Sequence, residues 1–324
     1  MLVGIILGAI GILMIILFLF AFLIHYRVFG KRWEPDGIVK YYTKEEYDNF
    51  DALAIKFLHK GKYLHGFLYS YPFERYKGII VFSHGMWGSH KAYLQEIEAF
   101  AKAGYQVIGF DNYGTELSAG KNIKGLGNSL ACLKSAVTYA KNNYPKEKIY
   151  VVGHSWGGFA ANSIAKYHSD IEAIISLAGF LSVRRALVSL LPKGLYILIP
   201  FLILIDFMKC GAYSLVHAKK VLAKTQVRTL LIHSMDDTMV KYALNTGYLQ
   251  KKIHNPKVEY LIVDGKHHNP DYSIEAIEYA NQVMKELREL PKDQQEAFRK
   301  EISYHKMGQL DQEVLQKMVD FLNN

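Results

Sequence analysis

The chain contains few cysteines and no metal-binding pattern. Cys132 and Cys210 are the only two cysteines among 324 residues, and they lie far apart in the sequence. This predicts two reduced structural thiols rather than a disulfide framework. Histidines outside the motifs described below, such as His25, His65 and His168, show neither the spacing nor the clustering of metal ligands. We therefore expect no metal and no cofactor.

The sequence also lacks the features of a nucleic-acid-binding protein. Its formal net charge is +9 at pH 7, but the lysines and arginines form no dense block. No zinc-ligand array and no RNA-binding signature is present, so a nucleic-acid partner is not expected. Internal repeats and low-complexity tracts are absent as well.

Charged residues are missing from the first part of the chain. Residues 2–24 are mostly Leu, Ile, Phe, Ala and Gly. As a helix they would extend about 34 Å, which is enough to cross the hydrocarbon core of a bilayer. A cleaved signal peptide fits less well, because nothing basic precedes the run, the run is too long and no small-x-small site follows it. The sequence predicts a transmembrane anchor at residues 1–25 and a juxtamembrane linker at residues 26–49.

Basic and aromatic residues follow the apolar run directly. They are His25, Tyr26, Arg27, Lys31, Arg32 and Trp33. This pattern is typical of an interfacial belt with a positive flank, and the positive-inside rule places the C-terminal side in the cytoplasm. We therefore expect a single-pass membrane protein with its main domain in the cytoplasm. A basic domain lying against anionic lipid explains the net charge, so membrane lipids are expected partners.

Short apolar runs alternate with helical patterns from residue 50 onward. A β-hairpin is expected at residues 53–69, and further strands are expected at 78–83, 105–110, 148–152, 172–178, 228–233 and 258–263. Short, all-apolar strands separated by helices indicate a mostly parallel sheet with helices on both faces. The sequence thus predicts one α/β domain at residues 50–324.

One segment, residues 180–226, interrupts this alternation. Its middle, residues 187–208, is strongly apolar but contains two prolines and a glycine. A second transmembrane helix is an alternative, but Lys193, Asp206 and the prolines argue against it. We expect an apolar helical cap over the functional site.

The segment Lys148–Gly158 carries the most specific motif of the chain. It is a β-rich run that breaks into Gly153-His-Ser155-Trp-Gly157 and continues as a helix of small residues. A strand that turns sharply into a helix leaves no room for side chains two positions either side of the central residue. This context predicts a nucleophile elbow, which exposes the Ser155 hydroxyl and points the N–H of Trp156 at the same space.

A serine hydroxyl is a poor nucleophile unless a base lies beside it, and that base needs an orienting carboxylate. The sequence offers both groups directly after two consecutive predicted strands, where ligands bind in an open α/β sheet. Asp236 and Asp237 follow one strand, and His267 and His268 follow the next. The chain order is serine, acid, histidine, and the residues alone leave both choices between neighbours open.

These motifs resemble those of the α/β-hydrolases, in particular serine aminopeptidase-like and monoacylglycerol-lipase-like hydrolases. The resemblance covers residues 50–324. It implies the α/β-hydrolase fold, with a mostly parallel central sheet, helices on both faces and an apolar helical cap, here preceded by one transmembrane helix.

The loops of this family select one residue from each pair. The family's acid loop commonly reads His-Gly-x-x-Asp-x-x-Val, which selects Asp237 when laid onto residues 233–240. Its histidine loop is often Gly-x-Gly-His-Asn-Pro, which selects His268 when laid onto residues 265–270.

The chain departs from these family loops at two positions. Ser234 and His267 stand where glycine is usual. Asp236 and His267 therefore remain the alternatives to the acid and the base that the resemblance implies.

Acyl transfer also needs two backbone donors for the oxyanion, since losing one costs about 3–4 kcal/mol. One is expected to be the N–H of Trp156. The segment Ser83-His84-Gly85-Met86 resembles the family's His-Gly-x loop and gives the N–H of Met86 as the second donor. His84 is then expected to brace this loop.

The resemblance implies a serine hydrolase of the esterase or lipase type. Ser155 would attack the acyl carbon, His268 would transfer the proton, and Asp237 would hold the imidazolium. The apolar cap and the membrane anchor favour a hydrophobic small-molecule substrate, such as a lysolipid or a monoacylglycerol. Peptidase or thioesterase activity of the same residues is an alternative, and so is a non-catalytic module that binds a lipid or a partner.

Overall fold

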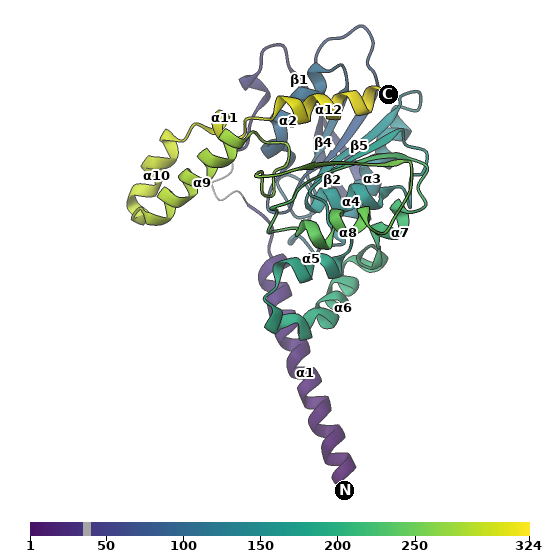
Figure 1. Cartoon of the computed structure of the whole chain (residues 1–324), viewed down its shortest axis with the longest axis vertical. Helices are drawn as coiled ribbons and strands as arrows, with labels where there is room; N and C mark the ends of the chain where they lie inside the picture. Colours follow the sequence, from purple (N-terminus) through teal and green to yellow (C-terminus); the bar gives the residue numbers. More distant parts are fainter. Residues whose placement is uncertain (35–39) are drawn as a thin grey trace.

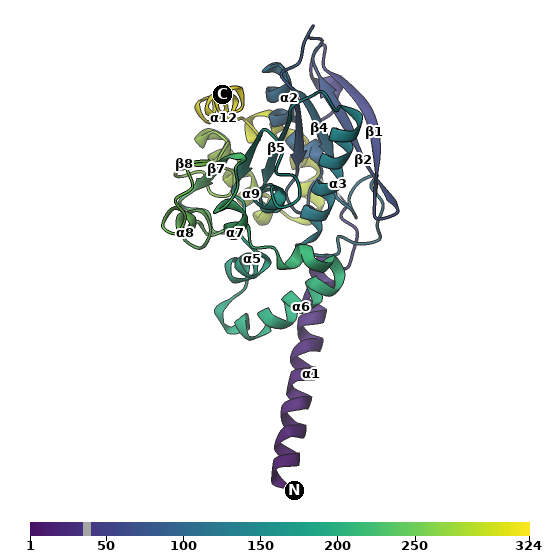
Figure 2. The same cartoon turned by 90° about the vertical axis from the view of Figure 1, so that its right-hand side faces the viewer.

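The computed structural model describes residues 1–34 and 40–324. Its body is a sheet with helices on both faces, and one long N-terminal helix extends away from that body (Figure 1 and Figure 2). Part of the predicted juxtamembrane linker, residues 35–39, lies outside the described residues.

In the part of the chain that the structure describes, eight strands form a single sheet. They are β1 (Asp51–His59), β2 (Lys62–Ser70), β3 (Ile79–Ser83), β4 (Gln106–Phe110), β5 (Ile149–His154), β6 (Ala173–Leu177), β7 (Arg228–Ser234) and β8 (Val258–Val263). Their order across the sheet is β1-β2-β4-β3-β5-β6-β7-β8. The β1–β2 hairpin and the β2–β4 pair are antiparallel, and the remaining pairs are parallel. The predicted, mostly parallel sheet is confirmed.

Helices cover both faces of this sheet. The α-helices described outside the cap are α1 (Leu2–Phe29), α2 (Leu94–Lys102), α3 (Asn128–Asn143), α4 (Trp156–Ile164), α8 (Thr246–Gln250), α9 (Ile274–Glu289), α10 (Lys292–Glu301), α11 (Tyr304–Met307) and α12 (Gln312–Asn323). On β3, Ile79 and Val81 belong to the core that includes α3 and α4, whereas Ile80 and Phe82 belong to the core that includes α2 and α12. Because each central strand is buried on both sides, it appears in the sequence as a continuous apolar run.

The segment predicted as a cap lies between β6 and β7. It consists of α5 (Val183–Leu190), η3 (Lys193–Leu198), α6 (Ile199–Cys210), η4 (Gly211–Leu215) and α7 (Ala218–Leu222). Both views place α5 and α6 between the body of the protein and the free end of α1 (Figure 1 and Figure 2). The ring of Phe201 on α6 contacts that of Phe18 on α1, with centroids 6.5 Å apart.

The long helix α1 is apolar on every side over residues 2–24, and its residues 2–16 are exposed. Its buried residues, Ala21, His25 and Phe29, are spaced by four and therefore share one face near the cap. The helix continues past residue 25, the predicted end of the anchor. By length and composition alone, α1 and the helical segment Lys193–Leu222 could each cross a membrane, although 33% of the second segment's most apolar stretch is buried.

Candidate active site

Ser155 stands between β5 and α4 in a strained backbone conformation. Its φ of 55° lies in the left-handed region that non-glycine residues rarely adopt. Its N–H donates to the carbonyl of Leu177 at 2.8 Å. A Cβ on Gly153 would lie 2.4 Å from the carbonyl oxygen of Gly157, and a Cβ on Gly157 would lie 1.9 Å from that of Ser83. The two glycines of the motif are therefore required by the backbone of this turn.

Three side chains from different loops meet at this turn. Oγ of Ser155 lies 2.8 Å from Nε2 of His268, and Nδ1 of His268 lies 2.8 Å from Oδ2 of Asp237. They follow the carboxyl ends of β5, β8 and β7, so the parallel sheet brings them to one edge. Since a carboxylate only accepts hydrogen bonds, Nδ1 carries the proton of the neutral ring. Nε2 is then the acceptor of the hydrogen bond from the Ser155 hydroxyl.

Asp237 is buried and held by several donors. The N–H groups of Met239 and Val240 donate to its Oδ1 at 2.8 and 2.9 Å, and Nε2 of His233 donates to its Oδ2 at 3.1 Å. Burial alone would raise the pKa of Asp237, but the hydrogen bonds from His233 and His268 outweigh it and hold this pKa well below 3.8. The carboxylate is therefore charged at neutral pH.

The neighbouring residues Asp236 and His267 form a separate pair. Nδ1 of His267 lies 2.6 Å from Oδ2 of Asp236, and these side chains are 53% and 29% exposed respectively. Within the described residues, His268 is the only side chain that hydrogen-bonds to the Ser155 hydroxyl. The structure thus brings His268 and Asp237 to Ser155 and leaves their alternatives at the surface.

The two predicted oxyanion donors lie beside Ser155. Met86 lines the same pocket as Ser155, and Trp156 is the first residue of α4, directly after the serine. Across residues 1–34 and 40–324, neither of these two backbone N–H groups has a hydrogen-bond acceptor. Such free donors are what a site for a developing negative charge requires.

His84 lies directly before this loop and braces it. Its Nε2 accepts from the N–H of Asn112 at 3.0 Å, and its Nδ1 donates to the carbonyl of Gly85 at 2.6 Å. Burial lowers the pKa of His84. The ring is therefore neutral, with the one donor and one acceptor that these two contacts need.

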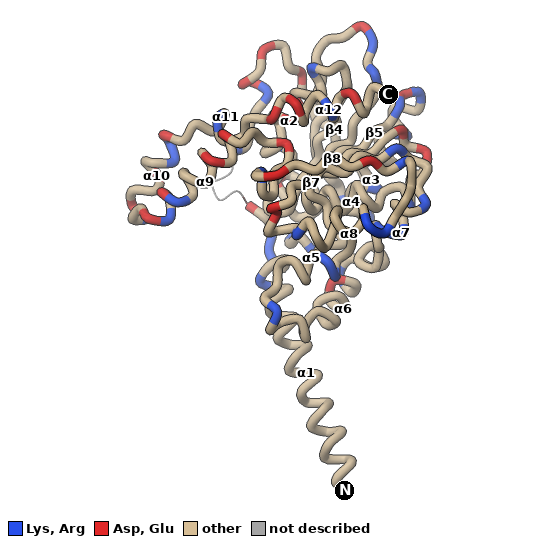
Figure 3. Tube along the Cα trace, in the orientation of Figure 1, with Lys and Arg blue, Asp and Glu red and all other residues tan. Residues whose placement is uncertain are grey.

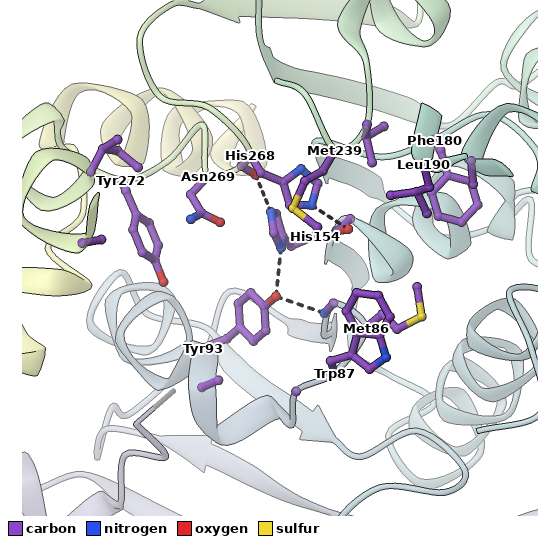
Figure 4. Close-up of a pocket in the computed structure, with 18 of the residues that line it drawn as sticks. Met86, Trp87, Tyr93, His154, Phe180, Leu190, Met239, His268, Asn269 and Tyr272 are labelled. Carbon is purple, nitrogen blue, oxygen red and sulfur yellow. Dashed lines mark hydrogen bonds between the residues drawn. The ribbon is translucent and has the colours of Figure 1, made fainter. Parts of the chain in front are cut away.

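Ser155 and His268 open into a pocket of about 360 Å³. Apolar side chains line most of it, including Met86, Trp87, Phe180, Leu190 and Met239. In Figure 4 these side chains lie on one side of His154, and Asn269 and Tyr272 lie on the other. Among the described residues that line the pocket there is no aspartate and no glutamate.

Sequence reasoning missed a buried contact between the cap and the elbow. The carboxylate of Asp206 on α6 accepts from the N–H groups of Leu126 and Gly127 at 2.6 and 3.1 Å, and from the hydroxyl of Ser214. The carbonyl of Leu126 in turn accepts from the indole N–H of Trp156 at 2.7 Å. Because Asp206 lies 80 positions from Leu126 in the chain, no local sequence motif predicts this contact.

A metal site would need several histidine, cysteine or acidic side chains gathered in one place. In the part of the chain that it describes, no group of three or more histidine, cysteine or acidic side chains is arranged to hold a metal ion. Cys132 and Cys210 are free and buried. Burial raises the pKa of the Cys132 thiol to about 12, so that thiol is uncharged and poorly nucleophilic.

Comparisons with known proteins agree with this architecture. Residues 74–202 match the family model of the serine aminopeptidases, S33. A comparison with curated proteins finds no match. Among solved structures, an esterase of Pyrococcus furiosus is 20% identical, with a TM-score of 0.59, and the match covers 80% of this chain and 98% of that one.

Two further structures extend the likeness. Est1E of Butyrivibrio proteoclasticus with bound ferulic acid is 21% identical, with a TM-score of 0.53 and coverage of 72% of this chain and 98% of that one. An acylaminoacyl peptidase of Pyrococcus horikoshii is 17% identical, with a TM-score of 0.52 and coverage of 69% and 39%. The predicted fold is confirmed: this chain is an α/β-hydrolase in fold, and residues 74–202 are similar to the serine aminopeptidase family.

Proposed function

We propose that this protein is a membrane-anchored serine hydrolase that cleaves an acyl ester. One observation carries the proposal: an unbroken hydrogen-bond path runs from Asp237 through His268 to Ser155, and the serine opens into an apolar pocket. A nucleophile, a base and an orienting carboxylate in this order are the parts that nucleophilic acyl transfer needs.

The geometry assigns each group a step. Oγ of Ser155 attacks the acyl carbon while Nε2 of His268 takes its proton, and the charged Asp237 stabilises the imidazolium that forms. The N–H groups of Met86 and Trp156 stabilise the oxyanion. His268 then gives the proton to the leaving alcohol. Water, activated by the same histidine, releases the acid from Ser155.

The pocket favours an apolar ester over an amino-terminal peptide. An aminopeptidase has to hold a positively charged α-amino group, which calls for a carboxylate partner in the pocket. The described lining residues include no aspartate or glutamate, and most of them are apolar. Peptidase activity remains the second candidate because the matching family model is that of serine aminopeptidases.

The surroundings of the pocket support a lipid-like substrate. Leu190 lines the pocket and is 45% exposed, and further along the cap Ile197, Phe207 and Met208 are 62%, 40% and 65% exposed. Exposed large apolar side chains are stabilised by a membrane surface rather than by water. Ile197 lies on η3, and Phe207 and Met208 lie on α6, and both elements pack against α1. The anchor would therefore hold the cap at the bilayer.

Charge supports the anchor and its orientation. Figure 3 shows α1 without a charged residue over most of its length, and basic residues begin where the helix reaches the body. Arg27 lies in the last turn of α1, and Lys31 and Arg32 follow it. By the positive-inside rule this end faces the cytoplasm, where anionic lipid would attract the basic domain.

A chain-length series tests the activity. The full-length protein in detergent micelles is given p-nitrophenyl esters of increasing acyl length and, separately, amino-acid p-nitroanilides. We expect ester hydrolysis that Ser155→Ala abolishes, with kcat/KM rising with acyl length until about 360 Å³ is filled. Hydrolysis of the anilides alone would replace the esterase with a peptidase. No Ser155-dependent hydrolysis of either series would overturn the enzymatic proposal.

Membrane extraction tests the anchor. The full-length protein should stay in the membrane fraction in high salt and at alkaline pH, and detergent should release it. Salt screens only exposed charges over a Debye length of about 10 Å at 0.1 M. Release by salt, or a mature N-terminus beyond α1, contradicts the anchor. Digestion of the domain by protease added outside intact cells contradicts the cytoplasmic placement.

A further inference from the structure

His154, the residue directly before Ser155, contacts two loops of the site at once. Its Nε2 lies 2.8 Å from the backbone carbonyl oxygen of His268, and its Nδ1 lies 2.8 Å from the hydroxyl of Tyr93. That hydroxyl also accepts from the N–H of Gly85 at 3.1 Å. Figure 4 shows this path between the loop of His268 and the loop of Met86.

Each group on this path has only one compatible role. The carbonyl of His268 can only accept, so Nε2 of His154 carries the ring proton and Nδ1 accepts. The Tyr93 hydroxyl therefore donates to Nδ1, which leaves its oxygen free to accept from the N–H of Gly85. Burial raises the pKa of Tyr93, so its hydroxyl keeps the proton that it donates.

The path requires a neutral His154, and its surroundings keep the ring neutral. Burial, together with the charge of the nearby His268, lowers the pKa of His154 to about 3. The two imidazole rings have centroids 4.9 Å apart. A charged His154 would oppose the positive charge that His268 acquires when it takes the serine proton.

The close fit at Gly85 shows how tightly this path is enclosed. A Cβ on Gly85 would lie 2.5 Å from the Tyr93 hydroxyl oxygen and 3.4 Å from Nδ1 of His154. The Tyr93 hydroxyl thus occupies the space in which a side chain at position 85 would stand. The loop of Met86, called the oxyanion loop below, can approach the loop of His268 only because glycine is present at position 85.

We propose that His154 and Tyr93 are positioning residues that fix the oxyanion loop relative to the catalytic histidine. Neither residue transfers a proton in the reaction. The pair sets the separation between the N–H of Met86, which follows Gly85, and the ring of His268. The proposal rests on the proposed function, because it describes how the same site is held in register.

Misplacement of reacting groups by about 1 Å costs on the order of 10²-fold in rate. We therefore expect Tyr93→Phe to lower kcat by about 10- to 100-fold and to leave KM within about two-fold, since the phenyl ring still fills the space. His154→Phe should lose at least as much. His154→Gln keeps an amide N–H that can reach the His268 carbonyl, and it should recover part of the loss.

A matched control removes a tyrosine hydroxyl from a different buried contact between a tyrosine and a histidine. Oη of Tyr69 lies 3.0 Å from Nε2 of His90, and that contact does not reach the loop of His268. Tyr69→Phe should therefore keep the wild-type kcat. Amide hydrogen exchange gives a readout that does not depend on activity: residues 84–88 and 265–270 should both exchange faster in Tyr93→Phe and in His154→Phe.

The experiment measures kcat, KM, fluorophosphonate labelling and amide exchange in all four variants, with thermal unfolding as the check on folding. Wild-type kcat in both Tyr93→Phe and His154→Phe overturns the positioning role. So does an equal loss in Tyr69→Phe, or a His154→Gln variant no better than His154→Phe. If the wild-type protein is not labelled at all, the proposed function fails, while faster exchange in both loops would still establish the contact.

Discussion

Two aspartate–histidine pairs stand side by side in this protein, and they differ in what surrounds them. Asp237 and His268 lie 2.8 Å apart, with side chains 0% and 15% exposed, and they connect to Ser155. Asp236 and His267 lie 2.6 Å apart, but they are 29% and 53% exposed. A short distance between acid and histidine is therefore not what distinguishes the pair that reaches Ser155 from the pair that does not.

The difference comes from the backbone and side-chain groups that hold each pair. Oδ1 of Asp237 is held by two N–H groups of its own loop, and His233 holds Oδ2, so the acid has a fixed orientation. His267 instead adopts a φ of 49°, which turns its side chain to the surface and lets His268 face the serine. An exposed ion pair contributes about 0–1 kcal/mol to the stability of the fold. Removing a partner from a buried, fully hydrogen-bonded carboxylate is strongly destabilising, because it leaves a buried charge without compensation.

The largest difference between the pairs should appear in turnover. Ser155→Ala and His268→Ala should each lower kcat by a factor on the order of 10⁴ or more, with KM little changed, because each removes a transition-state role. His267→Ala should keep kcat within about three-fold of wild type, since its ring makes no contact with Ser155. Steady-state kinetics with a short ester measure both. Loss of activity in His267→Ala with activity retained in His268→Ala would reverse the assignment.

Substitutions of the two aspartates should differ almost as much in their effect on kcat. Asp237→Asn should lower kcat by about 10⁴-fold, because an amide N–H facing Nδ1 favours the wrong imidazole tautomer. Asp236→Asn should have a far smaller effect, because its partner His267 does not reach the serine. The same ester assay gives the comparison, and equal losses in the two variants would contradict it.

Acid pH should weaken the fold more through Asp237 than through Asp236. The pKa of Asp237 is well below 3.8 in the folded protein, so the unfolded chain binds more protons once pH falls below about 4. The stabilisation from the charged acid is complete above that pH and is lost as pH falls toward the folded-state pKa. Urea titrations at pH 5 and pH 3 should show a smaller acid loss in Asp237→Asn than in wild type. If Asp237→Asn loses as much stability between pH 5 and pH 3 as the wild type does, Asp237 is not the source of the acid sensitivity.

The smallest expected effect concerns the strained residue of the exposed pair. His267 has a positive φ, which glycine adopts without strain. His267→Gly should change the free energy of unfolding by less than about 1 kcal/mol and should be no less stable than His267→Ala, which keeps the strain. Thermal unfolding of the two variants measures this. A large loss specific to His267→Gly would show that the exposed pair stabilises the loop.

The sheet and its core followed from local patterns. Strands such as β3 and β5 are buried on both faces, so their apolar runs and the helices between them predict the parallel order directly. The elbow was predictable for a related reason, since the glycines around Ser155 reflect a steric constraint within a few residues. Both signals are carried by residues close together in the chain.

The choice within each pair and the supports of the site depend on longer-range contacts. Residue patterns alone did not separate Asp236 from Asp237; the family resemblance did. The partners of His154 and Asp206 come from distant segments, because Tyr93 lies 61 positions from His154 and Leu126 lies 80 positions from Asp206. No spacing rule in a single sequence encodes such contacts.

The rate at which a fluorophosphonate modifies Ser155 tests the central claim most directly, because it reports activation of the serine without the later steps of turnover. Purified wild-type, His267→Ala and His268→Ala proteins are mixed with the probe, and intact mass and peptide mapping follow the adduct over time. We expect a single adduct on Ser155 that forms at nearly the wild-type rate in His267→Ala and at least about 10³-fold more slowly in His268→Ala. An adduct on another residue, or equal rates in the two histidine variants, would contradict the claim that the buried pair activates Ser155.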